Sequence, residues 1–215
     1  MTRDDPERFI IANTGLGAPS LVPEITLHLA TDALPLWHKT EEELAEEGLP
    51  PPFWAFAWAG GQALARHLLD HPDGVSGKRV LDVGAGGGIV AIAAMKAGAR
   101  EVTANELDPF ALAAIGLNAA HNGVSVDVVA GDLLATDPPH DVILVGDLFY
   151  EKPLAERVLS FLRRARERGS TVLIGDPGRT YLPRKDLVQL SVHRVPVTRA
   201  LEDTDIKRTV VWTLP

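Results

Sequence analysis

Residues 80–89 read Val-Leu-Asp-Val-Gly-Ala-Gly-Gly-Gly-Ile, the pattern of a buried strand, a glycine-rich loop and the start of a helix. Glycine lets the backbone turn sharply and approach a ligand, and the free N–H groups of the following helix favour a negative group. A dinucleotide-binding loop needs its third glycine where Ile89 stands, and no Gly-Lys-Ser/Thr ending marks a P-loop. The segment therefore predicts an α/β fold with a different kind of ligand at this turn.

Short β-branched runs alternate with longer Ala- and Leu-rich stretches from residue 78 onward, which is typical of βαβ units and a parallel sheet. The predicted strands are 78–83, 101–106, 125–129, 141–146 and 170–175, and the predicted helices between them are 88–97, 109–121 and 151–168. After Pro177 the pattern predicts a short helix at 184–190 and two strands, 192–199 and 206–213. These two strands are expected to be antiparallel because only a turn-like segment separates them.

The first 77 of the 215 residues precede this repeating pattern. They predict a short strand at 25–30 and helices at 41–47 and 60–70, with consecutive prolines at 50–52 that end any helix. We interpret residues 1–77 as an extension that covers the core formed by residues 78–215, and not as an independent domain. The acidic helix at 41–47 is expected to be a solvated face, or to steer a lysine-bearing surface if it flanks the cleft.

Composition excludes several other classes of protein. The net charge of −8 argues against a general binder of nucleic acid or of anionic membranes, and no apolar run approaches the roughly 18 residues that span a bilayer. The absence of cysteine excludes thiol chemistry and suits a reducing compartment, so we expect a cytoplasmic protein, and we expect a monomer. His67 and His71 lie one helical turn apart without a third ligand nearby, so no metal site is predicted.

Acidic residues mark the ends of three successive predicted strands. Asp82 stands two positions before the first glycine of the loop, Glu106 ends the second strand, and Asp132 follows the third. Ligands of open α/β sheets bind beyond the carboxyl ends of the strands, where an acid at the end of the second strand usually accepts the hydroxyls of a ribose. The three carboxylates are therefore expected to gather around one ligand that contains a ribose.

The D-x-G-x-G-x-G form of residues 82–88 resembles motif I of the class I S-adenosylmethionine-dependent methyltransferases, which have a Rossmann-like fold. The resemblance implies S-adenosylmethionine as the cofactor and S-adenosylhomocysteine as its product. It also implies that Asp82 holds the cofactor's ammonium group, Glu106 its ribose and Asp132 its adenine amino group. The cofactor-binding residues that we expect are Trp58, Asp82, Gly84, Ala85, Gly86, Glu106, Leu107, Asp132 and Leu133.

Residues 147–150, Asp-Leu-Phe-Tyr, follow the fourth predicted strand and resemble the D-x-x-Y motif of protein lysine methyltransferases of methyltransferase family 16. A lysine amine, with a pKa of about 10.4, must lose a proton before it attacks a methyl group. Asp147 is expected to receive the ammonium and orient the amine, and Tyr150 to shape the channel. The alternative is that Asp147 caps the helix near Glu151 and Tyr150 packs beneath that helix.

The aromatic segment at residues 53–62 reads Phe-Trp-Ala-Phe-Ala-Trp-Ala-Gly-Gly-Gln. Because Trp54, Phe56 and Trp58 alternate, we expect one face of the segment to line a pocket around the cofactor and the acceptor. The family resemblance puts Trp58 at the cofactor. Aromatic packing of the N-terminal extension onto the sheet is the alternative, and the two are compatible.

Four segments, 53–61, 147–150, 175–179 and 195–199, resemble the branch of family 16 that methylates the β-subunit of the electron transfer flavoprotein. The resemblance runs from about residue 23 to the C-terminus and implies methylation of lysines on a folded protein partner. Two alternatives remain open. One is a methyltransferase that acts on a ribosomal protein or a small amine, and the other is a non-catalytic module that binds or chaperones its partner.

Overall fold

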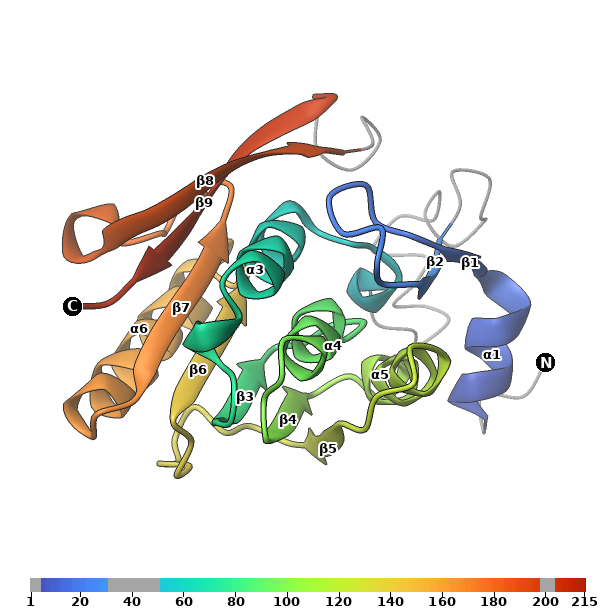
Figure 1. The fold of residues 1–215 in the computed structure, drawn as a ribbon, viewed down its shortest axis with the longest axis horizontal. Helices are drawn as coiled ribbons and strands as arrows, with labels where there is room; N and C mark the ends of the chain where they lie inside the picture. Colours follow the sequence, from blue (N-terminus) through green and yellow to red (C-terminus); the bar gives the residue numbers. More distant parts are fainter. Residues whose placement is uncertain (1–4, 31–50, 198–203) are drawn as a thin grey trace.

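The computed structural model describes residues 5–30, 51–197 and 204–215, whose main feature is a seven-stranded sheet with helices on both faces (Figure 1). The parallel strands are β3 (Arg79–Val83), β4 (Glu101–Glu106), β5 (Asp127–Ala130), β6 (Val142–Gly146) and β7 (Thr171–Asp176). The antiparallel strands β8 (Val188–Pro196) and β9 (Ile206–Thr213) complete the order β5-β4-β3-β6-β7-β9-β8. The predicted α/β fold with a C-terminal antiparallel hairpin is confirmed.

Alternate residues of the central strands face the two sides of the sheet. Val142 and Leu144 of β6 belong to the cluster under α3 (Ala59–Asp70), α4 (Ile89–Lys96) and α5 (Pro109–His121), which lie in front of the sheet in Figure 1. Ile143 and Val145 instead join the cluster under α6 (Lys152–Glu167), behind the sheet. The apolar run of this strand thus reflects burial on both faces.

The predicted helix at 184–190 is wrong, and the strand after it begins earlier than expected. Only a 3-10 turn, η3 (Arg184–Asp186), forms there, and β8 begins at Val188. Val188, Leu190 and Val192 are all exposed, so burial does not separate a strand from a helix in this segment. Short apolar runs of this kind fit either element, and pairing with β9 decides between them.

The N-terminal residues contain a helix that the sequence analysis did not identify, α1 (Pro6–Asn13), whose first turn is capped by the Asp5 carboxylate at 3.2 Å from the Arg8 amide. The expected strand at 25–30 is confined to β2 (Leu27–Leu29), which pairs with β1 (Gly15–Gly17) in a separate two-stranded sheet. The acidic helix expected at 41–47 lies outside the described residues. Within the described ranges, the helices are all too short or too polar to cross a membrane.

Helix α3 lies very close to the carboxyl ends of β6 and β7, and glycine makes this approach possible. A Cβ atom at Gly60 would overlap the carbonyl oxygen of Gly175 and the carboxylate of Asp147, and a Cβ at Gly175 would overlap the Gly60 carbonyl oxygen. A Cβ at Gly146 would lie 3.3 Å from the Cα of Gly61. The four glycines therefore form an interlocked contact that leaves no room for a methyl group at Gly60 or Gly175.

A group of histidines joins α3 to the edge strand β8. The Ser191 hydroxyl lies 3.0 Å from Nδ1 of His67 and 2.9 Å from Nε2 of His193, and the His67 and His71 rings are 4.7 Å apart. The spacing of His67 and His71 is visible in the sequence, whereas only the fold shows that β8 brings His193 close to them. No group of three or more possible metal ligands occurs among the described residues.

Because of these histidines, we expect the free energy of unfolding to decrease in mild acid. Burial, with help from His71 and His193, lowers the pKa of His67 from 6.5 to about 4. Unfolding therefore takes up a proton between these two values, so the free energy of unfolding falls as the pH falls from about 6.5 towards 4. Urea unfolding at a series of pH values should show a smaller fall for His67→Gln than for the wild type. His121→Gln, at the exposed end of α5, is the control, and equal slopes in all three proteins would contradict the prediction.

Candidate functional site

A cavity of about 460 Å³ opens at the carboxyl ends of β3, β4 and β6. It is lined by seven of the nine predicted cofactor residues: Trp58, Gly84, Gly86, Glu106, Leu107, Asp132 and Leu133. Both predicted acceptor residues, Asp147 and Tyr150, line the same cavity. The fold thus brings together residues from segments that are widely separated in the sequence, at the sheet edge where α/β proteins bind their ligands.

The glycine loop is held in a conformation that other residues rarely adopt. Gly84, Gly86 and Gly88 have φ angles of 64°, 55° and 83°. A Cβ at Gly84 would lie 2.8 Å from the side chain of Leu148, whereas a Cβ at Gly86 would meet nothing closer than 4.0 Å. The loop therefore turns its bare backbone towards the cavity, which suits close approach by a ligand.

Glu106 ties the glycine loop to the end of β4. One carboxylate oxygen accepts the Gly86 N–H at 2.8 Å, and the other accepts the Leu107 N–H at 2.8 Å. Asn105, which the sequence analysis did not identify, donates to the carbonyl oxygens of Val129 and Gly131 at 3.0 and 2.8 Å and so fixes the end of β5. Side chains from β4 therefore hold the glycine loop and the end of β5 in place around the cavity.

Asp132 lies at the β5 end of the cavity and is already charge-paired. Its carboxylate accepts the Leu134 N–H at 3.0 Å and forms an ion pair with Arg157 of α6. This pairing lowers the pKa of Asp132. Arg157 also lines the cavity, and it was not identified from the sequence because it lies 25 residues beyond Asp132.

Two of the predicted cofactor residues, Asp82 and Ala85, are not among the lining residues. The side chain of Asp82 is directed at helix α4, where it accepts the Ala91 N–H at 3.0 Å, and only 1% of the residue is exposed. Burial raises the pKa of Asp82 to about 8, so the carboxyl group is mostly uncharged at neutral pH. The contact of Asp82 with a cofactor ammonium stays a prediction.

Asp147 is held from two sides by other parts of the fold. Its Oδ2 accepts the Gly61 N–H at the start of α3 at 2.9 Å, and its Oδ1 accepts two N–H groups of Arg179 at 3.0 and 2.7 Å. The residue has a φ of 60°, is 8% exposed, and burial raises its pKa to about 6 against the opposing effect of Arg179. The alternative that Asp147 caps α6 is wrong, because Glu151 is the N-cap and no side chain caps that helix.

The aromatic segment divides between two environments. Phe53 and Trp58 line the cavity with Tyr150, and the Phe53 ring is 6.0 Å from Trp58 and 6.2 Å from Tyr150. Trp54 is buried elsewhere and stacks on Phe110 at 6.3 Å. The expectation that residues 54, 56 and 58 share one face is wrong because residues 53–55 form a 3-10 turn instead of an extended strand. Tyr150 is 47% exposed, so it does not pack beneath α6.

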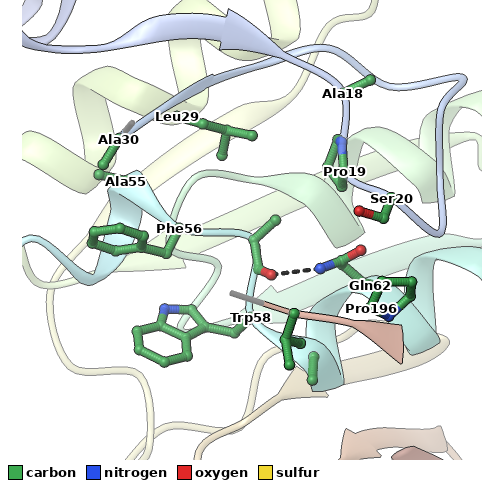
Figure 2. A pocket seen from close by; sticks show the side chains of 13 residues that line it. Ala18, Pro19, Ser20, Leu29, Ala30, Ala55, Phe56, Trp58, Gln62 and Pro196 are labelled. Atoms are coloured by element: carbon green, nitrogen blue, oxygen red, sulfur yellow. Dashed lines mark hydrogen bonds between the residues drawn. The ribbon is translucent and has the colours of Figure 1, made fainter. Parts of the chain in front are cut away.

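Figure 2 shows a second cavity, of about 250 Å³, and Trp58 lines both the first cavity and this one. Phe56, Leu29 and Pro196 line it, and it therefore joins the aromatic segment to β2 and to the end of β8. Gln62 donates to the Ala57 carbonyl oxygen at 2.7 Å, as the dashed line in Figure 2 marks. Trp58 is thus a lining residue of both cavities.

The comparisons with known proteins agree with this geometry. A family model described as ribosomal protein L11 methyltransferase (PrmA) matches residues 66–173, about half of the chain. The electron transfer flavoprotein beta subunit lysine methyltransferase of Danio rerio is 37% identical over 98% of this chain and 84% of that protein, and the one of Homo sapiens is 38% identical over 93% and 77%. Among solved structures, a ribosomal protein L11 methylase from Lactobacillus delbrueckii subsp. bulgaricus has a TM-score of 0.52 at 22% identity, covering 74% of this chain and 80% of that chain.

Proposed function

This chain belongs to the family of the electron transfer flavoprotein β-subunit lysine methyltransferases, and we propose that its own substrate is the β-subunit of an electron transfer flavoprotein. It is an S-adenosylmethionine-dependent protein lysine N-methyltransferase. One observation carries the proposal for the site: a single cavity is lined both by the glycine loop with Glu106 and by Asp147 with Tyr150. Cofactor and acceptor residues that meet in one cavity are what direct group transfer requires.

The residues of the cavity suit the cofactor. Bound S-adenosylmethionine supplies an electrophilic methyl group, which the lone pair of a neutral lysine amine takes while the C–S electron pair returns to sulfur. We assign the cofactor to Trp58, the Gly84–Gly86 turn, Glu106, Leu107, Asp132 and Leu133, and keep Asp82 and Ala85 as members of the motif. Glu106 supports its assignment, because each of its oxygens makes one backbone hydrogen bond and keeps acceptor capacity for a ribose hydroxyl.

We assign Asp147 and Tyr150 to the acceptor. Asp147 accepts its present hydrogen bonds from Gly61 and Arg179, and a carboxylate has room for one further N–H donor, so it can orient an amine. Tyr150 is half exposed beside Phe53, and the two rings frame the cavity where a lysine side chain enters. The aliphatic part of lysine is apolar, which aromatic walls suit.

We also propose that residues 1–77 are an extension of the 78–215 core and not an independent domain, and that the protein is a cytoplasmic monomer. The first part is supported by packing, since Val22, Ile25 and Leu27 belong to the same buried cluster as α3 and α4. The proposed cytoplasmic location is supported by the absence of cysteine from the 215 residues, which suits a reducing compartment.

The test of the substrate uses purified protein and cofactor with a labelled methyl group. Incubation with a bacterial lysate, and separately with purified flavoprotein, should label lysines of the β-subunit. Label in a ribosomal protein would support the alternative substrate, and label in nucleic acid would overturn protein methylation. Cofactor binding without transfer to any protein would favour the non-catalytic binding module.

A further inference from the structure

Arg179 is the cation that occupies the acceptor end of the cavity. Its guanidinium donates from Nε and Nη2 to the same Asp147 oxygen, at 3.0 and 2.7 Å, and lies 5.5 Å from the centre of the Trp58 ring. Its backbone N–H is anchored by Asp176 at 2.7 Å, and only 20% of its side chain is exposed. Arg179 is thus held by a carboxylate, an aromatic face and the turn after β7 at once.

This pairing changes what a lysine side chain meets on entering the cavity. From the sequence, Asp147 is expected to receive the lysine as an ammonium ion. In the structure the negative charge of Asp147 is already matched, and the guanidinium beside it repels a second cation in a poorly solvated site. A neutral amine carries no such penalty, and it can still donate one N–H to Asp147.

We propose, on the basis of the function proposed above, that Arg179 is a positioning residue that keeps Asp147 ionised and makes the cavity select the neutral form of the acceptor lysine. The lysine ammonium releases its proton to water at the exposed mouth, beside Phe53 and Tyr150, and the amine then enters. Methyl transfer forms the new N–C bond and leaves the nitrogen with a positive charge. The same guanidinium then repels the methylated ammonium and favours its departure.

Other charged and titratable groups face this pair from the surrounding elements. Asp176 on β7 acts on Asp147, and Arg184 in η3 acts on Asp176. Glu106 on β4 and Glu151 before α6 act on Tyr150, which lines the same cavity. Burial raises the pKa of Asp176, and Arg184 donates to the Gly178 carbonyl oxygen at 3.1 Å. Arg179 is the cation in direct contact with Asp147.

The test is the pH profile of kcat, which reports the groups of the enzyme–substrate complex, for the wild type, Arg179→Gln and Arg179→Lys, with cofactor and protein substrate both saturating. Loss of the guanidinium should move the midpoint of the rising limb up by about one pH unit, because a like charge within a few ångströms shifts a titration by that amount or more. Arg179→Lys should restore most of the shift. Arg184→Gln removes a nearby positive charge in η3, which does not pair with Asp147, and should leave the midpoint in place. A wild-type midpoint in Arg179→Gln, or no rescue by lysine, would overturn the proposal.

A second measurement does not depend on turnover. The carboxyl carbon of Asp147, observed by NMR in protein with carbon-13-labelled aspartate and assigned with Asp147→Asn, should titrate at a higher pH in Arg179→Gln than in the wild type. S-adenosylhomocysteine should bind both proteins within about threefold. An unchanged Asp147 titration would overturn the role of Arg179 even if no flavoprotein substrate is found. Failure of the wild type to methylate the flavoprotein, with the Asp147 shift present, would instead count against the proposed substrate.

Discussion

Replacing Gly60 by alanine is expected to destabilise the protein by at least about 2 kcal/mol and to lower its activity, because the added methyl group has no space. The new Cβ would overlap the carbonyl oxygen of Gly175 and the carboxylate of Asp147. The backbone of β7 cannot yield as a flexible side chain can, so helix α3 must move off the sheet. That movement also breaks the hydrogen bond from Gly61 to Asp147. Urea unfolding and methyl transfer measure the two effects.

The matched control is Gly116→Ala in helix α5. A Cβ at this exposed position meets nothing within 4 Å. Alanine is the better helix former by about 0.5–1 kcal/mol, so this variant should be slightly more stable than the wild type. If Gly60→Ala unfolds at the same urea concentration as the wild type, the close contact between α3 and β7 is not what holds the helix in place.

The variant Asp147→Asn is expected to lose at least about 100-fold in kcat while it keeps its affinity for S-adenosylhomocysteine. The asparagine oxygen can still accept the Gly61 N–H, so the start of α3 stays in place. The negative charge that pairs with the Arg179 guanidinium is lost, however, so Asp147 no longer neutralises it. The amine then has no fixed anion to orient it. Single-turnover rates and calorimetric titration with the product separate the two effects.

Asp186→Asn serves as the control because it removes a carboxylate from an exposed ion pair with Arg163, outside the cavity. It should turn over at the wild-type rate. Full activity of Asp147→Asn would remove the residue from the proposed acceptor site, whereas loss of product binding would mean that the substitution disturbs the whole cavity. If Asp147→Asn is fully active, the motif at residues 147–150 has a structural role only.

The sequence predicted the elements best where local pattern and tertiary burial agree. The strand at 101–106 and the helix at 109–121 have the predicted bounds. The start of the helix is marked by Asp108, whose side chain accepts the Phe110 N–H, and by Pro109 at the first helical position. The first part of strand β8 was not predicted because a short run with apolar residues fits a helix as well as a strand. Several of these apolar residues are exposed in the structure.

The site was predicted in part for a similar reason. A motif read along the chain identifies Glu106, Asp147 and Tyr150 because they follow strands. The hydrogen-bond partners of Asp147 are Gly61, 86 positions before it, and Arg179, 32 positions after it. No local sequence pattern predicts contacts over such separations. Arg179 lay within a segment that carries the family resemblance, and only the folded contact shows what it touches.

The interlocked glycines at the start of α3 have a consequence for anyone who wishes to redesign this protein. A methyl group at Gly60 would overlap the Asp147 carboxylate, and one at Gly175 would overlap Gly60 itself, so the contact that fixes the helix also fixes the acceptor residue. Rigidity and catalytic geometry are therefore specified by the same few atoms. Library diversity at these positions will mainly yield inactive, poorly folded members, whereas the exposed rings of Phe53 and Tyr150 can be varied with far less risk to the fold.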